Sequence, residues 1–145
     1  MSVISTDTAN TELERPSRTW IRKTGIVISC LVTAFLAFDA AGKLAAAPQV
    51  KEATHALGFP PGQALVMGIV LAVCVAVFVI PRTAVLGALG ITAYLGGAVT
   101  ANMRVESPLL THTLFAVYLG VLMWVGLAMR RPQLLAVVGL RRTAD

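Results

Sequence analysis

The chain has 145 residues, of which 57% are apolar and only 13% are charged, and its mean hydropathy is +0.78. These values exclude an ordinary soluble domain, in which about a quarter of the residues are charged, and they indicate a membrane protein. The net charge of +5 does not indicate a nucleic-acid partner, because the basic residues stand beside apolar stretches rather than along a polar face.

The N-terminal residues 1–23 are polar up to about residue 19 and end in Arg22 and Lys23, so we expect a disordered cytoplasmic tail. The apolar stretch that follows is too long for the core of a signal peptide and lacks a convincing cleavage site. We therefore expect it to stay in the mature protein as a membrane anchor.

Four apolar stretches have close to the roughly 20 residues that a helix needs to cross a bilayer. They lie at 24–47, 62–80, 83–103 and 109–129. This predicts an all-α integral membrane protein, an antiparallel bundle of four transmembrane helices over residues 24–131, followed by a cytoplasmic tail at 132–145. Pro81 and Arg82 leave almost no loop between the second and third spans, which predicts a tight hairpin.

An even number of spans places both termini on one side of the membrane. That side would hold nine basic residues: Arg15, Arg18, Arg22, Lys23, Arg82, Arg130, Arg131, Arg141 and Arg142. The other side would hold three: Lys43, Lys51 and Arg104. Because basic residues are enriched in cytoplasmic loops, both termini are predicted to be cytoplasmic.

The outer segment 48–62 carries helix signals at both ends, since Pro48 can start a helix while Gly58 and the following prolines end it. Apolar residues recur at helical spacing within it, at Val50, Ala53 and Leu57. This predicts a short amphipathic helix at the membrane interface, with an ordered connecting loop as the alternative.

The third span presents small residues at a four-residue spacing on two neighbouring faces. One face holds Thr92, Gly96 and Thr100, and the next holds Ala93, Gly97 and Ala101. Such stripes let helices approach closely in a bilayer, which suits packing within the bundle or, alternatively, a homodimer face.

Polar side chains gather in the outer halves of the spans. With a rise of about 1.5 Å per residue, Asp39, Tyr94 and Tyr118 share a depth of about 12 Å below the outer ends of their helices. Nearer the outer surface come Lys43, Asn102, Arg104 and His112. These seven residues are the candidate ligand-binding group, in a pocket that opens outward.

A carboxylate at the depth of Asp39 is costly and usually has a partner. Lys43 stands four residues later, in the favourable order for an intrahelical ion pair, and Arg104 could instead fold inward as a bidentate partner. The charges are either structural or part of a ligand or proton site that includes Asp39, Lys43, Tyr94, Arg104 and His112.

No strong catalytic or metal-binding motif accompanies this group in the sequence. The pair His55 and His112 lacks an arranged third ligand, so we predict no metal site. Cys30 and Cys74 both fall inside predicted spans and are expected to be small buried apolar residues rather than a disulfide.

The order of these features resembles the DoxX-like family of small membrane proteins. The matching elements run over residues 25–132: a first span ending in GKL with an acid one turn earlier, LGFP, a hairpin around PR, AYLGGAVTANMR, and a last span closing in MRRP. The resemblance implies a four-helix bundle in a bacterial inner membrane, and partners or subunits of quinone-linked and thiol-linked oxidoreductases.

On the family's pattern the positions carried over are Lys43, Gly58, Pro60, Gly96, Gly97 and Arg104. The resemblance makes a quinone the one possible cofactor. This chain departs from the thiol-linked members because it has no cysteine pair on the outer side.

Three functions are compatible with these observations. The first is an accessory membrane protein that binds a partner subunit, a lipid or a quinone in the outward-facing pocket. The second is a small membrane enzyme, an isomerase, cyclase or oxidoreductase that acts on a hydrophobic substrate. In it Asp39 is the general acid or base, Tyr94 or Arg104 stabilises an oxyanion, and His112 is a further catalytic candidate. The third is a small proton-coupled exporter, which the biased charge distribution disfavours.

Overall fold

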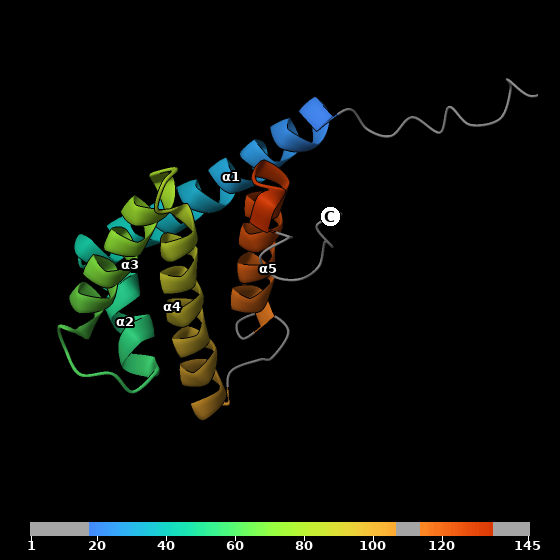
Figure 1. The fold of residues 1–145 in the computed structure, drawn as a ribbon. Coiled ribbons are helices and arrows are strands. Elements are labelled where there is room, and N and C mark those ends of the chain that lie inside the picture. The colour runs from blue at the N-terminus through green and yellow to red at the C-terminus, as the bar shows by residue number, and fades with distance from the viewer. Residues whose placement is uncertain (1–17, 107–113, 135–145) are drawn as a thin grey trace, which may run out of the picture.

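The computed structural model describes residues 18–106 and 114–134, and all regular structure in this part of the chain is helical (Figure 1). The helices are α1 (Arg18–Leu44), α2 (Pro48–Ala56), α3 (Gln63–Val79), α4 (Ala84–Arg104) and α5 (Leu114–Arg130). The all-helical prediction is confirmed for these residues. The predicted tails fall largely outside them, at 1–17 and 135–145.

The structure refines the sequence prediction at the start of α1 and in the segment after it. Helix α1 begins at Arg18 rather than at residue 24, because Arg and Lys are good helix formers and extend the helix beyond its apolar stretch. The segment after α1 is a helix and not a loop: α2 has Pro48 in its first turn, and Gly58 follows it with a φ of +79°.

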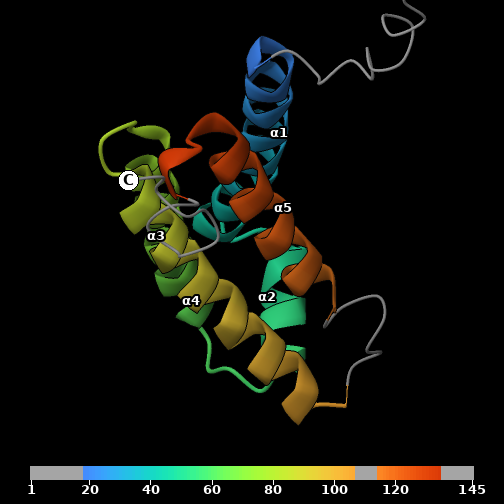
Figure 2. The ribbon, with the colours of Figure 1, turned by 45° about the vertical axis from the view of Figure 1, so that its right-hand side comes forward.

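The four long helices form a ring in which each packs against two neighbours (Figures 1 and 2). Helices α1 and α4 each contact both α3 and α5. Helix α2 packs against α1 and α3, at the opposite end of the molecule from the start of α1. Fully buried side chains in the middle of the ring include Leu36, Leu71, Phe78, Ile91, Met123 and Leu127.

Glycines allow the closest approaches between neighbouring helices. A Cβ atom added to Gly87 of α4 would overlap the backbone nitrogen and Cα of Phe78 in α3. A Cβ added to Gly126 of α5 would lie 2.9 Å from Ser29 Oγ of α1. These close approaches are the kind of packing that small residues permit in a membrane.

The turn between α3 and α4 is as tight as its sequence predicts. The Thr83 hydroxyl donates to the Val77 carbonyl at 2.8 Å, which closes the hairpin. Arg131, just after α5, donates to the carbonyl of Pro81. The end of α5 is therefore tied to the α3–α4 turn across 50 residues of chain.

The outer surfaces of the helices are strongly apolar. By length and composition two helices could cross a membrane, Thr19–Leu44 and Ala84–Arg104, and only 28% and 22% of their apolar windows are buried inside the molecule. Helices α3 and α5 are apolar and have 17 residues each. Such large exposed apolar surface suits contact with lipid rather than with water.

Candidate functional site

A cavity of about 590 Å³ lies within the ring, on the side closed by α2. Its wall comes from α1, α2, α4 and α5, with Met67 from α3 and two residues of the loop after α2. Most of this wall is apolar, and its larger apolar side chains include Phe35, Leu36, Leu57, Phe59, Phe115 and Leu119. Four of the predicted site residues line it: Asp39, Lys43, Tyr94 and Asn102.

Asp39 and Lys43 form an ion pair in the cavity wall. Lys43 Nζ donates to Asp39 Oδ1, one helical turn away on α1. The side chain of Lys43 is 15% exposed and that of Asp39 is 36% exposed, so both are partly removed from solvent. Of the two partners that the sequence left open for Asp39, the structure selects Lys43, because a spacing of four residues already places the two groups side by side.

Tyr94 and Asn102 bring two further polar groups to the same wall from α4. They stand eight residues apart, so they lie on one face of the helix. The Asn102 amide nitrogen donates to the Ala98 carbonyl at 2.9 Å, which leaves its amide oxygen and its second N–H for a ligand. Tyr94 packs partly against the apolar core.

Arg104 does not pair with Asp39 in this structure. Its Nη2 donates to the carbonyl of Leu57 at 3.1 Å, and Gly58 lies so close that an added Cβ would be 2.7 Å from the same nitrogen. The long side chain lies over the turn after α2, where a helix end leaves carbonyl groups without helical partners. Arg104 thus anchors α2 and is not among the lining residues.

Tyr118 and His112 complete the predicted group. Tyr118 shares the predicted depth but not the face: it is exposed on α5, whereas the residues of α5 that line the cavity are Phe115, Ala116 and Leu119. His112 lies outside the described residues.

Sequence reasoning missed the part of the wall that comes from α2. The cavity is lined by the apolar stripe of the outer segment, which consists of Val50, Ala53 and Leu57. The helical spacing of these residues was therefore a signal for a cavity wall as well as for membrane contact. Also missed was an aromatic pair: Phe35 and Phe115 meet edge to face, with ring centroids 5.4 Å apart.

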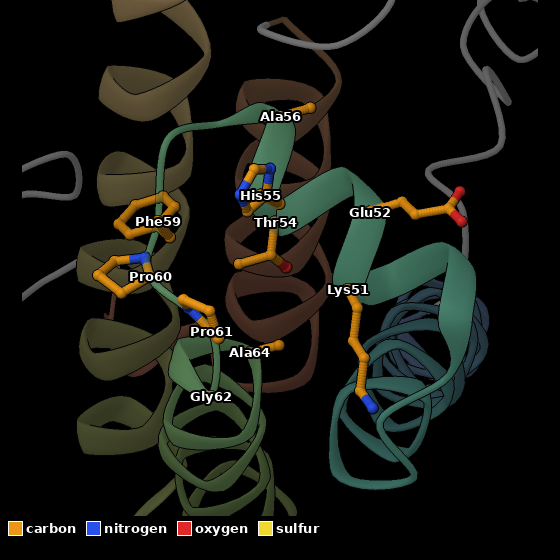
Figure 3. A pocket seen from close by; sticks show the side chains of 10 residues that line it. All are labelled: Lys51, Glu52, Thr54, His55, Ala56, Phe59, Pro60, Pro61, Gly62 and Ala64. Carbon is orange, nitrogen blue, oxygen red and sulfur yellow. The ribbon is translucent and has the colours of Figure 1, made fainter.

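A second cavity, of about 650 Å³, lies on the other face of α2 (Figure 3). Its wall includes Lys51 and His55 of α2 and the turn residues Phe59, Pro60 and Pro61. In Figure 3 the side chain of Glu52 extends away from this turn. Both cavities share Thr54 and Phe59, so α2 forms a partition between them.

The two cysteines differ in their exposure. Cys30 is exposed on α1, so the expectation that it is buried was wrong: it lies on the outward face of the helix, while Cys74 is half-buried. Both are free thiols. Within residues 18–106 and 114–134 no group of three or more His, Cys, Asp or Glu side chains could hold a metal ion.

Residues 27–126 match the sequence profile of the DoxX-like family, a range that contains every lining residue of both cavities and more than half of the chain. The chain belongs to the DoxX-like family. The resemblance seen in the sequence is thus confirmed, and membership in a membrane-protein family means that this DoxX-like chain contacts a lipid bilayer. Comparison with curated proteins and with solved structures found no match.

Proposed function

We propose that this DoxX-like protein is an accessory membrane protein that binds a hydrophobic small molecule in the cavity beneath α2. The observation that carries the proposal is the composition of the cavity wall: an apolar surface interrupted by a few polar groups, namely Asp39, Lys43, Gln49, Thr54, Tyr94 and Asn102. Ligand sites commonly have this composition, and a volume of about 590 Å³ suits a drug-sized molecule.

The proposal includes four membrane spans, α1, α3, α4 and α5, with α2 at the outer surface and both termini in the cytoplasm of a bacterium. At about 1.5 Å per residue, the 17 residues of α3 and of α5 extend about 26 Å, close to the thickness of a bilayer's hydrocarbon core. The basic residues Arg22, Lys23, Arg82 and Arg130 support this orientation in the inner membrane.

A quinone is chemically compatible with this wall, and a partner would then be a membrane oxidoreductase. The Lys43 ammonium and the Tyr94 hydroxyl are hydrogen-bond donors of the kind that carbonyl oxygens accept. When bound, the quinone would supply the redox chemistry, and the protein's residues would hold and orient it.

A small membrane enzyme is the second candidate, favoured by the presence of a carboxylate and a phenol, Asp39 and Tyr94, on one cavity wall. These are groups that general acid–base catalysis uses. In that case Asp39→Asn abolishes turnover of the bound molecule but leaves expression and thermal stability nearly intact, whereas equal losses of both would indicate a structural ion pair.

The proposed function is tested by native mass spectrometry of the protein extracted gently from its own membrane. We expect wild-type protein to carry a small hydrophobic molecule. Gly97 lines the cavity and has open space around its Cβ position, so Gly97→Leu should fill the cavity and reduce occupancy at least tenfold.

Gly96→Leu is the matched control, because Gly96 has equally open space but does not line the cavity. It should keep the wild-type mass. A bare wild-type chain, or equal loss in both variants, would contradict ligand binding at this cavity. A co-purifying membrane protein whose binding is unaffected by Gly97→Leu would instead support a partner-binding role at another surface.

A further inference from the structure

The charges in the cavity beneath α2, which Asp39 and Lys43 line, balance each other. Among the lining residues in 18–106 and 114–134, Asp39 and Lys43 are the formally charged ones, and they are joined in one ion pair. Arg104 is engaged by the Leu57 carbonyl and stands outside the wall. Lys51 and Glu52 line the second cavity, on the other face of α2. The cavity beneath α2 therefore has a formal net charge of zero over the residues described.

A neutral cavity in an apolar surrounding discriminates among ligand headgroups by charge. A charged headgroup must leave water, and here it would find no unmatched opposite charge unless it broke the pair of Asp39 and Lys43. An uncharged headgroup pays a much smaller desolvation cost and needs only hydrogen bonds. Tyr94 and Asn102 of α4 can supply them, as can the remaining N–H groups of Lys43.

The rest of the wall is suited to an apolar body. Phe35 and Phe115 present aromatic surface, and Leu119 extends it along α5. On α4 the small residues Ala93 and Gly97 leave room beside them. The polar groups and the apolar surface thus occupy one continuous cavity, as the binding of an amphiphile requires.

We propose that the cavity selects an uncharged amphiphile, with a hydroxyl or carbonyl headgroup, and that the ion pair of Asp39 and Lys43 sets this selectivity. This inference rests on the proposed function, since it names the class of ligand for the same cavity. Asp39 and Lys43 act as specificity-determining residues: each cancels the charge that the other would present to a ligand. Removing one of them should change which headgroup charge is accepted.

The test uses full-length protein in nanodiscs of phosphatidylcholine and three probes that share one chain: oleyl alcohol, oleyl sulfate and oleyl trimethylammonium. Their headgroups are uncharged, permanently anionic and permanently cationic, so the charges of the probes do not change with pH. Binding is measured by native mass spectrometry over a titration. Wild-type protein should bind the alcohol at least tenfold more tightly than either charged probe.

The variants change the charge of the cavity in opposite directions. Asp39→Asn leaves Lys43 without its carboxylate and should raise affinity for the sulfate at least tenfold. Lys43→Gln leaves Asp39 without its ammonium and should raise affinity for the trimethylammonium probe similarly. The double variant Asp39→Asn/Lys43→Gln is neutral again and should return to the preference for the alcohol.

The outcomes separate the two proposals. If wild-type protein binds none of the probes, and carries no hydrophobic molecule when extracted from its own membrane, the proposed function itself fails. If it binds all three equally, or if the single variants fold and keep the wild-type order of affinities, ligand binding stands and the charge selectivity is overturned. Should one single variant fail to fold, the other still decides the question, because each leaves one unmatched charge in the cavity and predicts a gain for the probe of opposite charge.

Discussion

At the scale of single residues, two basic side chains near the α2 end of the molecule have different uses. Lys43 neutralises Asp39 inside the cavity wall, whereas Arg104 reaches from the last turn of α4 to the Leu57 carbonyl. The guanidinium group is rigid and has several donors, so it suits a carbonyl at a helix end. Arg104 thereby couples α4 to the turn that holds α2.

Replacing Arg104 with Gln should loosen α2 without disturbing the ring. One hydrogen bond to a charged donor contributes about 1.5–3 kcal/mol, so the amide protons of α2 should exchange roughly tenfold faster or more. Hydrogen-exchange mass spectrometry measures this directly. Arg82→Gln, which removes the same charge from the exposed α3–α4 turn, is the control and should leave α2 unchanged. Unchanged exchange in the Arg104 variant would show that this bond does not hold α2.

At the scale of elements, the α3–α4 hairpin is the most closely packed connection in the described residues. Pro81 shortens the turn, Thr83 closes it through its bond to the Val77 carbonyl, and Gly87 lets α4 rest against the backbone of α3 at Phe78. The contact is between backbones, so rotation of a side chain cannot relieve an added methyl group.

Gly87→Ala should therefore destabilise the protein by at least about 1–3 kcal/mol, the usual cost of overpacking a core. Thermal unfolding in detergent, followed by circular dichroism, should show a clearly lower Tm. Gly96→Ala is the matched control on the same helix, because its Cβ position is open. Equal Tm values for the two variants would mean that the helices separate more easily than the structure indicates.

At the scale of the whole molecule, the ring is apolar both inside and outside. Exposed residues such as Leu31, Phe38 and Leu86 would face water in a soluble protein, and in a bilayer they face lipid. Membership in the DoxX-like family and this surface together support the membrane setting. The proposed topology then puts α2 and the α3–α4 turn on opposite sides of the membrane.

This topology predicts opposite accessibilities for two introduced cysteines. In a background with Cys30 and Cys74 replaced by alanine, Glu52→Cys on α2 should react with a membrane-impermeant maleimide in intact spheroplasts. Arg82→Cys in the α3–α4 turn should react only after the membrane is opened. Both native side chains are exposed, so labelling reports the side of the membrane rather than burial. Reversed labelling would invert the topology, and labelling of both from outside would contradict the number of spans.

Hydropathy and local spacing were sufficient to predict the helices, the tight turn between α3 and α4, and one ion pair. The long apolar stretches, the helix at α2 and the tight turn at Pro81 depend on residues close together in the chain, and all of them appear in the structure. The ion pair of Asp39 and Lys43 was foreseeable for the same reason, because its four-residue spacing is a property of one helix.

The composition of the cavity wall was decided by the tertiary structure alone. Depth along a helix can be counted from the sequence, but the face that a residue presents depends on how the helix is rotated against its neighbours. Tyr94 and Tyr118 therefore share a depth while only Tyr94 lines the cavity. Arg104 is separated from Leu57 by 47 residues, and only the packing of the ring brings the end of α4 to the turn after α2. The sequence by itself thus determined the helices and their local pairs, and the packing between helices decided which of their faces form the cavity.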